Sequence, residues 1–89
     1  MLKNDVSDMI TAAQLRAARA LLGIDQRELA EQAGLSLPTI QRMEASHGVI
    51  RGNVESLTKL VTALTAAGIE FIGDAAPSRG KGRGVRLLE

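Results

Sequence analysis

The sequence predicts a mostly α-helical domain of four short helices that is followed by a two-stranded β-hairpin. Four segments between residues 11 and 68 carry apolar residues at helical spacing, and each segment begins at a capping residue. Glycine follows three of these segments, where it can end a helix. Beyond residue 68 the pattern changes to two short β-branched and aromatic runs, which are typical of strands.

The length and composition of the chain limit its function. Eighty-nine residues are enough for one small domain with a modest core. The chain has no cysteine, so disulfides and thiolate metal sites are excluded. No signal-like run stands near the start, and no apolar run approaches the roughly 18 residues of a membrane helix. We therefore expect a cytoplasmic protein that does not enter a membrane.

The first helix is predicted over residues 12–22. Thr11 is its N-cap, and Gly23 ends it. Its buried stripe is expected to contain Leu15, Ala18 and Leu22. Residues 1–10 have no clear period and are rich in residues that favour turns, so we interpret them as a loosely held N-terminal arm.

Two further helix signatures follow around one tight turn. Asp25 is the N-cap of the second helix, with Glu28 in the capping-box position. Gly34 ends this helix, because glycine adopts a positive φ without a Cβ penalty and lets the chain turn sharply. Ser36 caps the third helix, and Pro38 lies in its first turn, where a missing N–H is not needed. This arrangement is typical of a helix-turn-helix.

A fourth helix is predicted from Val54 to Ala67, with Asn53 as N-cap and Gly68 after its end. Its buried stripe is expected to contain Val54, Leu57, Leu60, Val61 and Leu64. The segment before it, A-S-H-G-V-I-R-G-N, has two glycines and no sustained period, so we expect a loop there. Residues 11–68 are therefore assigned to one helix-turn-helix domain.

The string Q-R-E-L-A-E-Q-A-G, followed by S-L-P-T-I-Q-R-M-E, resembles the core of Cro/lambda-repressor-type regulators, the xenobiotic-response-element (XRE) family. The resemblance covers residues 11 to 67 and implies a four-helix lambda-repressor-like DNA-binding domain. It also implies an ion pair between Arg19 and Glu44 that ties the first helix to the recognition helix. Relatives often carry a fifth helix, and this chain departs from that pattern.

The residues and the resemblance together predict a sequence-specific transcriptional regulator that binds double-stranded DNA with residues 36–46 in the major groove. We assign it as a repressor, although the sequence does not distinguish a repressor from an activator. The net charge of +1 is small for such a protein. Phe71 is the one aromatic residue, which argues against stacking platforms for single strands. The candidate DNA contacts lie at the second helix start, in the recognition helix and in the loop after it: Gln26, Ser36, Leu37, Pro38, Thr39, Gln41, Arg42, His47 and Arg51.

Arg42 is the principal candidate for a bidentate guanine contact. Alternatively, it pairs with a phosphate or with Glu31. The helix starts at Gln26 and Ser36 favour phosphate, because unpaired N–H groups point outward there. His47 has no second histidine and no cysteine to complete a ligand set, so a solvated or phosphate-adjacent position is favoured over a metal site.

The sequence does not predict an enzyme. It contains neither H-E-x-x-H nor G-x-S-x-G, and its acidic residues fall on helical faces where solvation is the usual role. The G-x-G-x-G run at residues 80–84 is not a nucleotide fingerprint, since no strand leads into a helix across it. No cofactor, metal or small-molecule ligand is indicated.

Residues 69–89 are predicted to form a β element for dimerisation, with a basic glycine-rich loop at residues 74–83. A two-stranded hairpin is marginal in water and needs a surface to lie on. We hypothesise a homodimer through the apolar residues of this element: Ile69, Phe71, Ile72, Val85, Leu87 and Leu88. The sequence leaves open whether the strands pair within one chain or between chains. The alternative function is a protein-binding module, such as an antitoxin or adaptor, that engages a protein through these strands.

Overall fold

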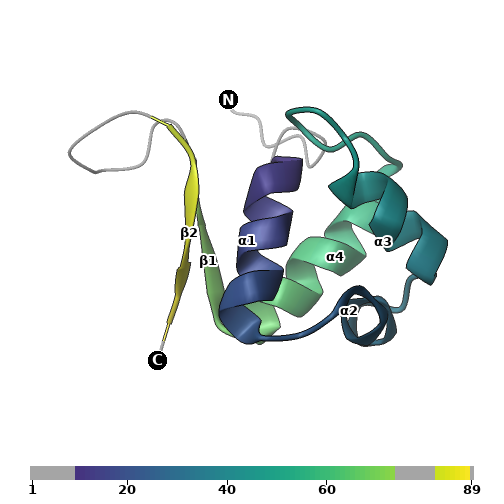
Figure 1. The fold of residues 1–89 in the computed structure, drawn as a ribbon, viewed down its shortest axis with the longest axis horizontal. Coiled ribbons are helices and arrows are strands. Elements are labelled where there is room, and N and C mark those ends of the chain that lie inside the picture. The colour runs from purple at the N-terminus through teal and green to yellow at the C-terminus, as the bar shows by residue number, and fades with distance from the viewer. Residues whose placement is uncertain (1–9, 74–81, 89) are drawn as a thin grey trace.

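The computed structural model describes residues 10–73 and 82–88. Its elements are, in chain order, α1 (Ala12–Leu22), α2 (Gln26–Ala33), α3 (Leu37–Glu44), α4 (Val54–Ala66), β1 (Ile69–Ile72) and β2 (Gly84–Leu87). The helices form one bundle, and the hairpin stands beside α1 at the opposite end of the molecule from α3 (Figure 1). The predicted fold class, four helices followed by a β-hairpin, is confirmed. None of these helices is long and apolar enough to cross a bilayer.

The helix starts and ends are set by local sequence. The Asp25 carboxylate accepts the N–H of Glu28 at 2.8 Å, and the Glu28 side chain accepts the N–H of Asp25 at 3.0 Å, which completes a capping box. Gly23 and Gly34 each have φ +70°, so both helix ends use the left-handed conformation that glycine adopts at no steric cost. The turn between α2 and α3 is therefore as tight as predicted.

One hydrophobic core joins the helices to β1. Its fully buried large side chains are Ile10, Leu15, Leu29, Ile40, Met43, Ile50, Leu57, Leu60, Leu64 and Ile69. Burying one such side chain contributes about 1.5–3 kcal/mol relative to leaving it exposed. The core therefore draws on all four helices, on the first strand, and on two residues that no helical period indicates.

Those two residues correct the sequence interpretation. Ile10 was assigned to a loosely held arm, yet it is 1% exposed and its carbonyl accepts the N–H of Ile50 at 3.1 Å. The N–H of Ala12 donates to Gly48 at 2.9 Å, and Thr11 and Val49 form a β-bridge. The chain before α1 is thus hydrogen-bonded to the α3–α4 loop. Such a contact between distant segments produces no periodic pattern of apolar residues in the sequence. Residues 1–9 of the predicted arm lie outside the described residues.

Helix α4 also differs from the prediction at both ends. Val54 was expected in the buried stripe but is 59% exposed, and residues 51–53 before it are exposed as well. At the other end, α4 stops at Ala66 with Ala67 as C-cap. Gly68 follows with φ +105°, and a Cβ there would lie 3.1 Å from the carbonyl oxygen of Leu88. Glycine is therefore required both for the turn and for the close approach of β2.

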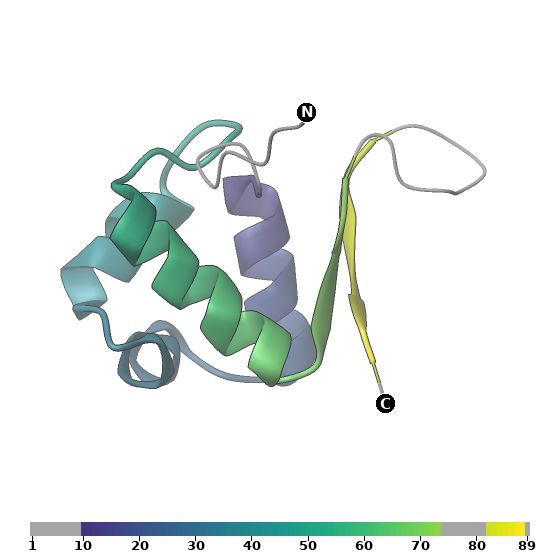
Figure 2. The same ribbon diagram turned by 180° about the vertical axis from the view of Figure 1, so that it is seen from behind.

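The strands pair antiparallel within one chain, which answers the question that the sequence left open. Ile69 opposes Leu87, and Phe71 opposes Val85. Ile69 is 1% exposed, and the other three side chains pack partly buried against the core. One face of the hairpin therefore covers the helical bundle, with α1 alongside it in both views (Figures 1 and 2).

Gln14 fastens the hairpin to α1 and was not identified from the sequence. This side chain is 4% exposed. Its Nε2 donates to the carbonyl oxygens of Ile72 at 3.1 Å and of Gly84 at 2.9 Å, while its Oε1 accepts the N–H of Thr11 at 2.9 Å. A single buried amide therefore links the start of α1 to the two strands.

We expect Gln14→Ala to lower the free energy of unfolding by about 1–3 kcal/mol, because the buried polar groups around it lose their partner. Urea unfolding followed by circular dichroism measures the change. The control is Gln32→Ala, since Gln32 is an exposed glutamine in α2. Equal stability of the two variants would show that the amide does not hold the hairpin.

Candidate nucleic-acid interface

Helix α3 has one anchored face and one exposed face. Ile40, Met43 and Glu44 are buried against the bundle. On the opposite side Pro38, Gln41 and Arg42 are exposed. The helix spans Leu37–Glu44 and is therefore shorter than the predicted recognition segment, residues 36–46. The exposed face of α3 carries polar side chains, and a major groove is wide enough to admit one α-helix such as this.

The N-terminus of α3 is organised by its cap. The Ser36 hydroxyl accepts the N–H of Thr39 at 3.2 Å, and the hydroxyl groups of the two residues lie 2.8 Å apart. Leu37 and Thr39, two of the predicted DNA contacts, are half-buried. Their side chains are therefore less accessible than those of Gln41 and Arg42. Pro38 lies in the first turn, as predicted.

Arg42 extends from the exposed face of α3 near its last turn. Among residues 10–73 and 82–88, its side chain has neither an ion-pair partner nor a hydrogen bond. The alternative pairing with Glu31 is therefore not present in the structure. An exposed guanidinium with all five donors available is the group that binds a guanine edge or a phosphate in two places at once.

Glu44 connects three helices behind this surface. It is 6% exposed, and its Oε2 accepts Nε of Arg19 at 2.7 Å. Its Oε1 accepts Nη2 of Arg19 at 3.2 Å and Nε2 of Gln26 at 3.0 Å. The structure thus contains the ion pair that the resemblance implies. The hydrogen bond with Glu44 raises the pKa of Arg19, so the guanidinium stays charged.

Gln26 has a second role that the sequence did not suggest. We assigned it to a phosphate contact, but its amide nitrogen already donates to Glu44. A phosphate contact by this side chain is therefore limited to the remaining amide proton. The backbone N–H groups in the first turn of α2 are the other phosphate donors at this position.

Arg16 supports α3 from α1. Its Nη1 donates to the backbone carbonyl of Glu44 at 2.6 Å. The last carbonyls of a helix lack partners within the helix, so an arginine from a neighbouring helix can satisfy one of them. Arg16 and Arg19 lie one turn apart on α1. Arg16 therefore binds the backbone of Glu44, and Arg19 binds its side chain.

We expect Arg16→Ala to reduce the free energy of unfolding by about 1 kcal/mol, which is typical of one hydrogen bond. The control is Arg27→Ala, because Arg27 is an exposed arginine of α2. Chemical denaturation of both variants under identical conditions gives the comparison. If the two lose the same stability, the contact with the Glu44 carbonyl is not stabilising.

The loop between α3 and α4 holds two more candidate contacts. His47 and Arg51 are both exposed. The backbone between them is fixed by the bonds of Gly48 to Ala12 and of Ile50 to Ile10. A loop held in this way presents its exposed side chains in a defined position next to the end of α3.

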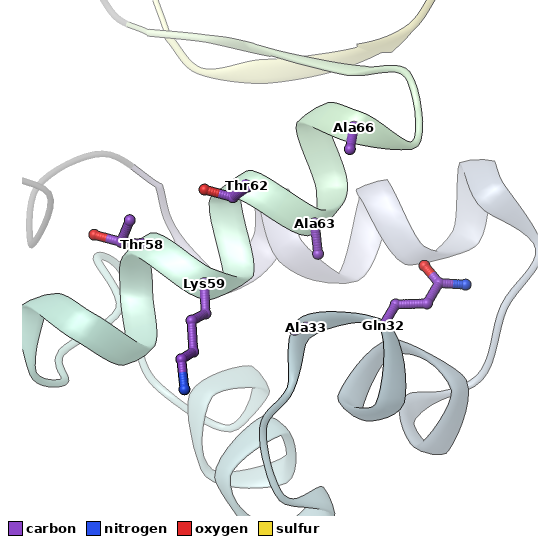
Figure 3. Close-up of a pocket in the computed structure, with 7 residues that line it drawn as sticks. All are labelled: Gln32, Ala33, Thr58, Lys59, Thr62, Ala63 and Ala66. Atoms are coloured by element: carbon purple, nitrogen blue, oxygen red, sulfur yellow. The ribbon is translucent and has the colours of Figure 1, made fainter.

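A shallow groove of about 380 Å³ lies between α2 and α4. Its lining, shown in Figure 3, consists of Gln32, Ala33, Thr58, Lys59, Thr62, Ala63 and Ala66. Lys59 pairs with Glu55 at 3.6 Å. In the described parts of the chain every buried side-chain N or O atom has a hydrogen-bond partner, and no group of three His, Asp or Glu could hold a metal ion. The polar side chains of the groove, on Gln32, Thr58, Lys59 and Thr62, are all exposed to solvent.

The fold and this surface define a small helix-turn-helix domain. A family model described as helix-turn-helix matches residues 15–64, which is more than half of the chain. The chain belongs to the Cro/lambda-repressor-type, or XRE, family of helix-turn-helix regulators. It is therefore a DNA-binding regulator. A search of curated proteins finds no match.

Proposed function

We propose that this protein is a transcriptional repressor that binds duplex DNA as a homodimer and reads the major groove with α3. The observation that carries the proposal is the outer face of α3, where Gln41 and Arg42 are exposed while Glu44 anchors the opposite face. A helix held by its buried face and polar on its outer face can enter a groove without disturbing the core. Arg42 then reads a guanine, and Gln41 reads a neighbouring base.

The remaining candidates take positions around this helix. Leu37 and Pro38 offer apolar contacts, such as one to a thymine methyl group. The helix starts at Gln26 and Ser36 are assigned to phosphate contacts, and the exposed side chains of His47 and Arg51 are assigned to further contacts beside them. Contacts to phosphates set the register, and contacts to bases supply the sequence preference.

Dimerisation increases the specificity of such a small domain. One domain reads only a few base pairs, whereas a twofold dimer reads two half-sites separated by one helical turn or a multiple of it. We propose a smaller dimer surface than the six apolar residues named from the sequence. Ile69, Phe71, Val85 and Leu87 pack against their own chain, which leaves Ile72 and Leu88 on the other face of the hairpin.

Selection from a random duplex pool tests this function. The full chain is mixed with the pool at two salt concentrations, and the enriched duplexes are sequenced. We expect a consensus of two symmetric half-sites, with affinity that falls steeply as salt rises, because phosphate binding releases counterions. A single-stranded pool is the control. Failure to enrich any duplex, or equal binding to single strands, would refute the proposal.

A further inference from the structure

The hairpin has a second face that no described element covers. Successive side chains of a strand point to opposite sides, so the residues between those of the inner face form an outer face. This outer face consists of Gly68, Glu70, Ile72, Gly84, Arg86 and Leu88. In both views α1 lies on one side of the hairpin and no described element lies on the other (Figures 1 and 2). Leu88 is 55% exposed there.

Each position of the outer face stands opposite a residue of complementary kind. Glu70 opposes Arg86, and the two form an ion pair at 3.0 Å. Ile72 opposes Gly84. The N–H of Leu88 donates to the carbonyl of Gly68 at 2.7 Å, which continues the pairing by one row. Across the two strands a large residue thus faces a glycine at each end, and opposite charges face each other in the middle.

We propose that a second copy of this chain packs on the outer face, with Glu70 of each copy against Arg86 of the other. A twofold interface requires a self-complementary surface. A twofold axis parallel to the strands and midway between them places each charge over the opposite charge. The same axis places Ile72 over the partner's Gly84. This second copy is the partner in the homodimer proposed above, so the interface rests on that part of the proposed function and not on DNA binding.

The charges can change partner at little cost. The side chains of Arg86 and Glu70 are 63% and 46% exposed. An exposed ion pair within one chain contributes about 0–1 kcal/mol, because water screens it. Excluding that water in an interface strengthens the attraction between the same charges and makes like charges strongly unfavourable.

The interface is small, so the dimer is weak in solution. Strands of four residues are about 13 Å long, and two of them are about 10 Å wide. A stable complex buries about 800 Å² on each partner. We therefore expect association at micromolar or higher concentrations, strengthened on DNA because two half-sites on one duplex raise the effective concentration.

Sedimentation equilibrium of the full chain without DNA tests the interface. Glu70→Arg and Arg86→Glu each place like charges together, and each should weaken self-association about tenfold or more. An equimolar mixture of these two variants should associate at least as tightly as the wild type, because both crossed contacts then join opposite charges. The chain with both reversals should also regain wild-type association. The matched controls are Glu55→Lys and Lys59→Glu, which reverse another exposed ion pair on α4 and should change nothing.

A second variant avoids the charge change within the chain. A Cβ at Gly84 would meet Ile72 Cδ1 at 3.9 Å, which is ordinary van der Waals contact, so we expect Gly84→Val to fold. It fills the space that the partner's Ile72 occupies and should weaken association about tenfold. Circular dichroism confirms that each variant is folded. Truncation of the chain after Gly68 would not test the interface alone, because it would also remove Ile69 from the hydrophobic core.

Three results would overturn the inference. The first is that the mixture of the Glu70→Arg and Arg86→Glu chains associates no better than either chain alone. The ion pair would then act only within one chain. The second is that the three single variants, Glu70→Arg, Arg86→Glu and Gly84→Val, all associate as tightly as the wild type. The interface would then lie on a strand edge or on the helices. The third is that the wild type remains monomeric at every concentration measured. A second copy would then not be the partner of the outer face. None of these results depends on DNA binding, which the duplex selection measures separately.

Discussion

Substitution of Glu44 by alanine is expected to lower the free energy of unfolding by about 3 kcal/mol, the lower end of the range for breaking a buried ion pair. The loss follows because Arg19 and Gln26 both give up their acceptor while they remain packed in the bundle. Arg19 is 25% exposed, so water compensates part of the unpaired charge. Urea unfolding of the full chain measures the change. Glu31→Ala is the control, since Glu31 is an exposed carboxylate of α2.

A double-mutant cycle separates the pair from the rest of the loss. Arg19→Ala with Glu44→Ala should recover part of the stability that Glu44→Ala loses, because the stranded guanidinium is then absent. The coupling energy is expected to lie between about 0.5 and 3 kcal/mol. Strictly additive losses would mean that the two side chains, although 2.7 Å apart, do not stabilise each other.

Substitution of Arg42 by alanine is expected to weaken binding to the selected duplex by about 1–3 kcal/mol, or roughly 5- to 150-fold. Arg42 is exposed and has no ion-pair partner among the described residues, so its removal leaves stability within about 0.5 kcal/mol. Fluorescence anisotropy with a labelled duplex gives the affinity. Lys59→Ala removes the same charge from α4 and should have a much smaller effect.

The consensus selected by the variant identifies what Arg42 contacts. Loss of preference at one base position per half-site indicates a base contact. A uniform loss of affinity with an unchanged consensus, together with a salt slope that falls by about one, would indicate a phosphate contact and would contradict the proposed base reading.

The helix-turn-helix could be predicted because its signals are local. Asp25, Gly34 and Ser36 each set the backbone of their immediate neighbours, through a capping bond or a positive φ, and such effects are nearly independent of the rest of the chain. The alternation of I-E-F-I likewise predicts a strand from local chemistry. These residues determine where elements begin and end, and the resemblance of the same string led to the family.

Contacts between distant segments were decided by the tertiary structure alone. Ile10 and Ile50 belong to the core because the chain before α1 lies against the α3–α4 loop, and no period in the sequence records that contact. Gln14 and Arg16 have ordinary positions on an amphipathic helix. Their hydrogen bonds to the hairpin and to α3 form only because those elements pack beside α1.

The apolar pattern of the hairpin likewise shows that a face must be covered, but it does not say by what. Burial depends on the distance between surfaces after folding, whereas propensity and capping act within a few residues. For this reason the sequence by itself determined the order and type of the elements, and the tertiary structure decided which side chains of α3 are exposed and which face of the hairpin covers the bundle.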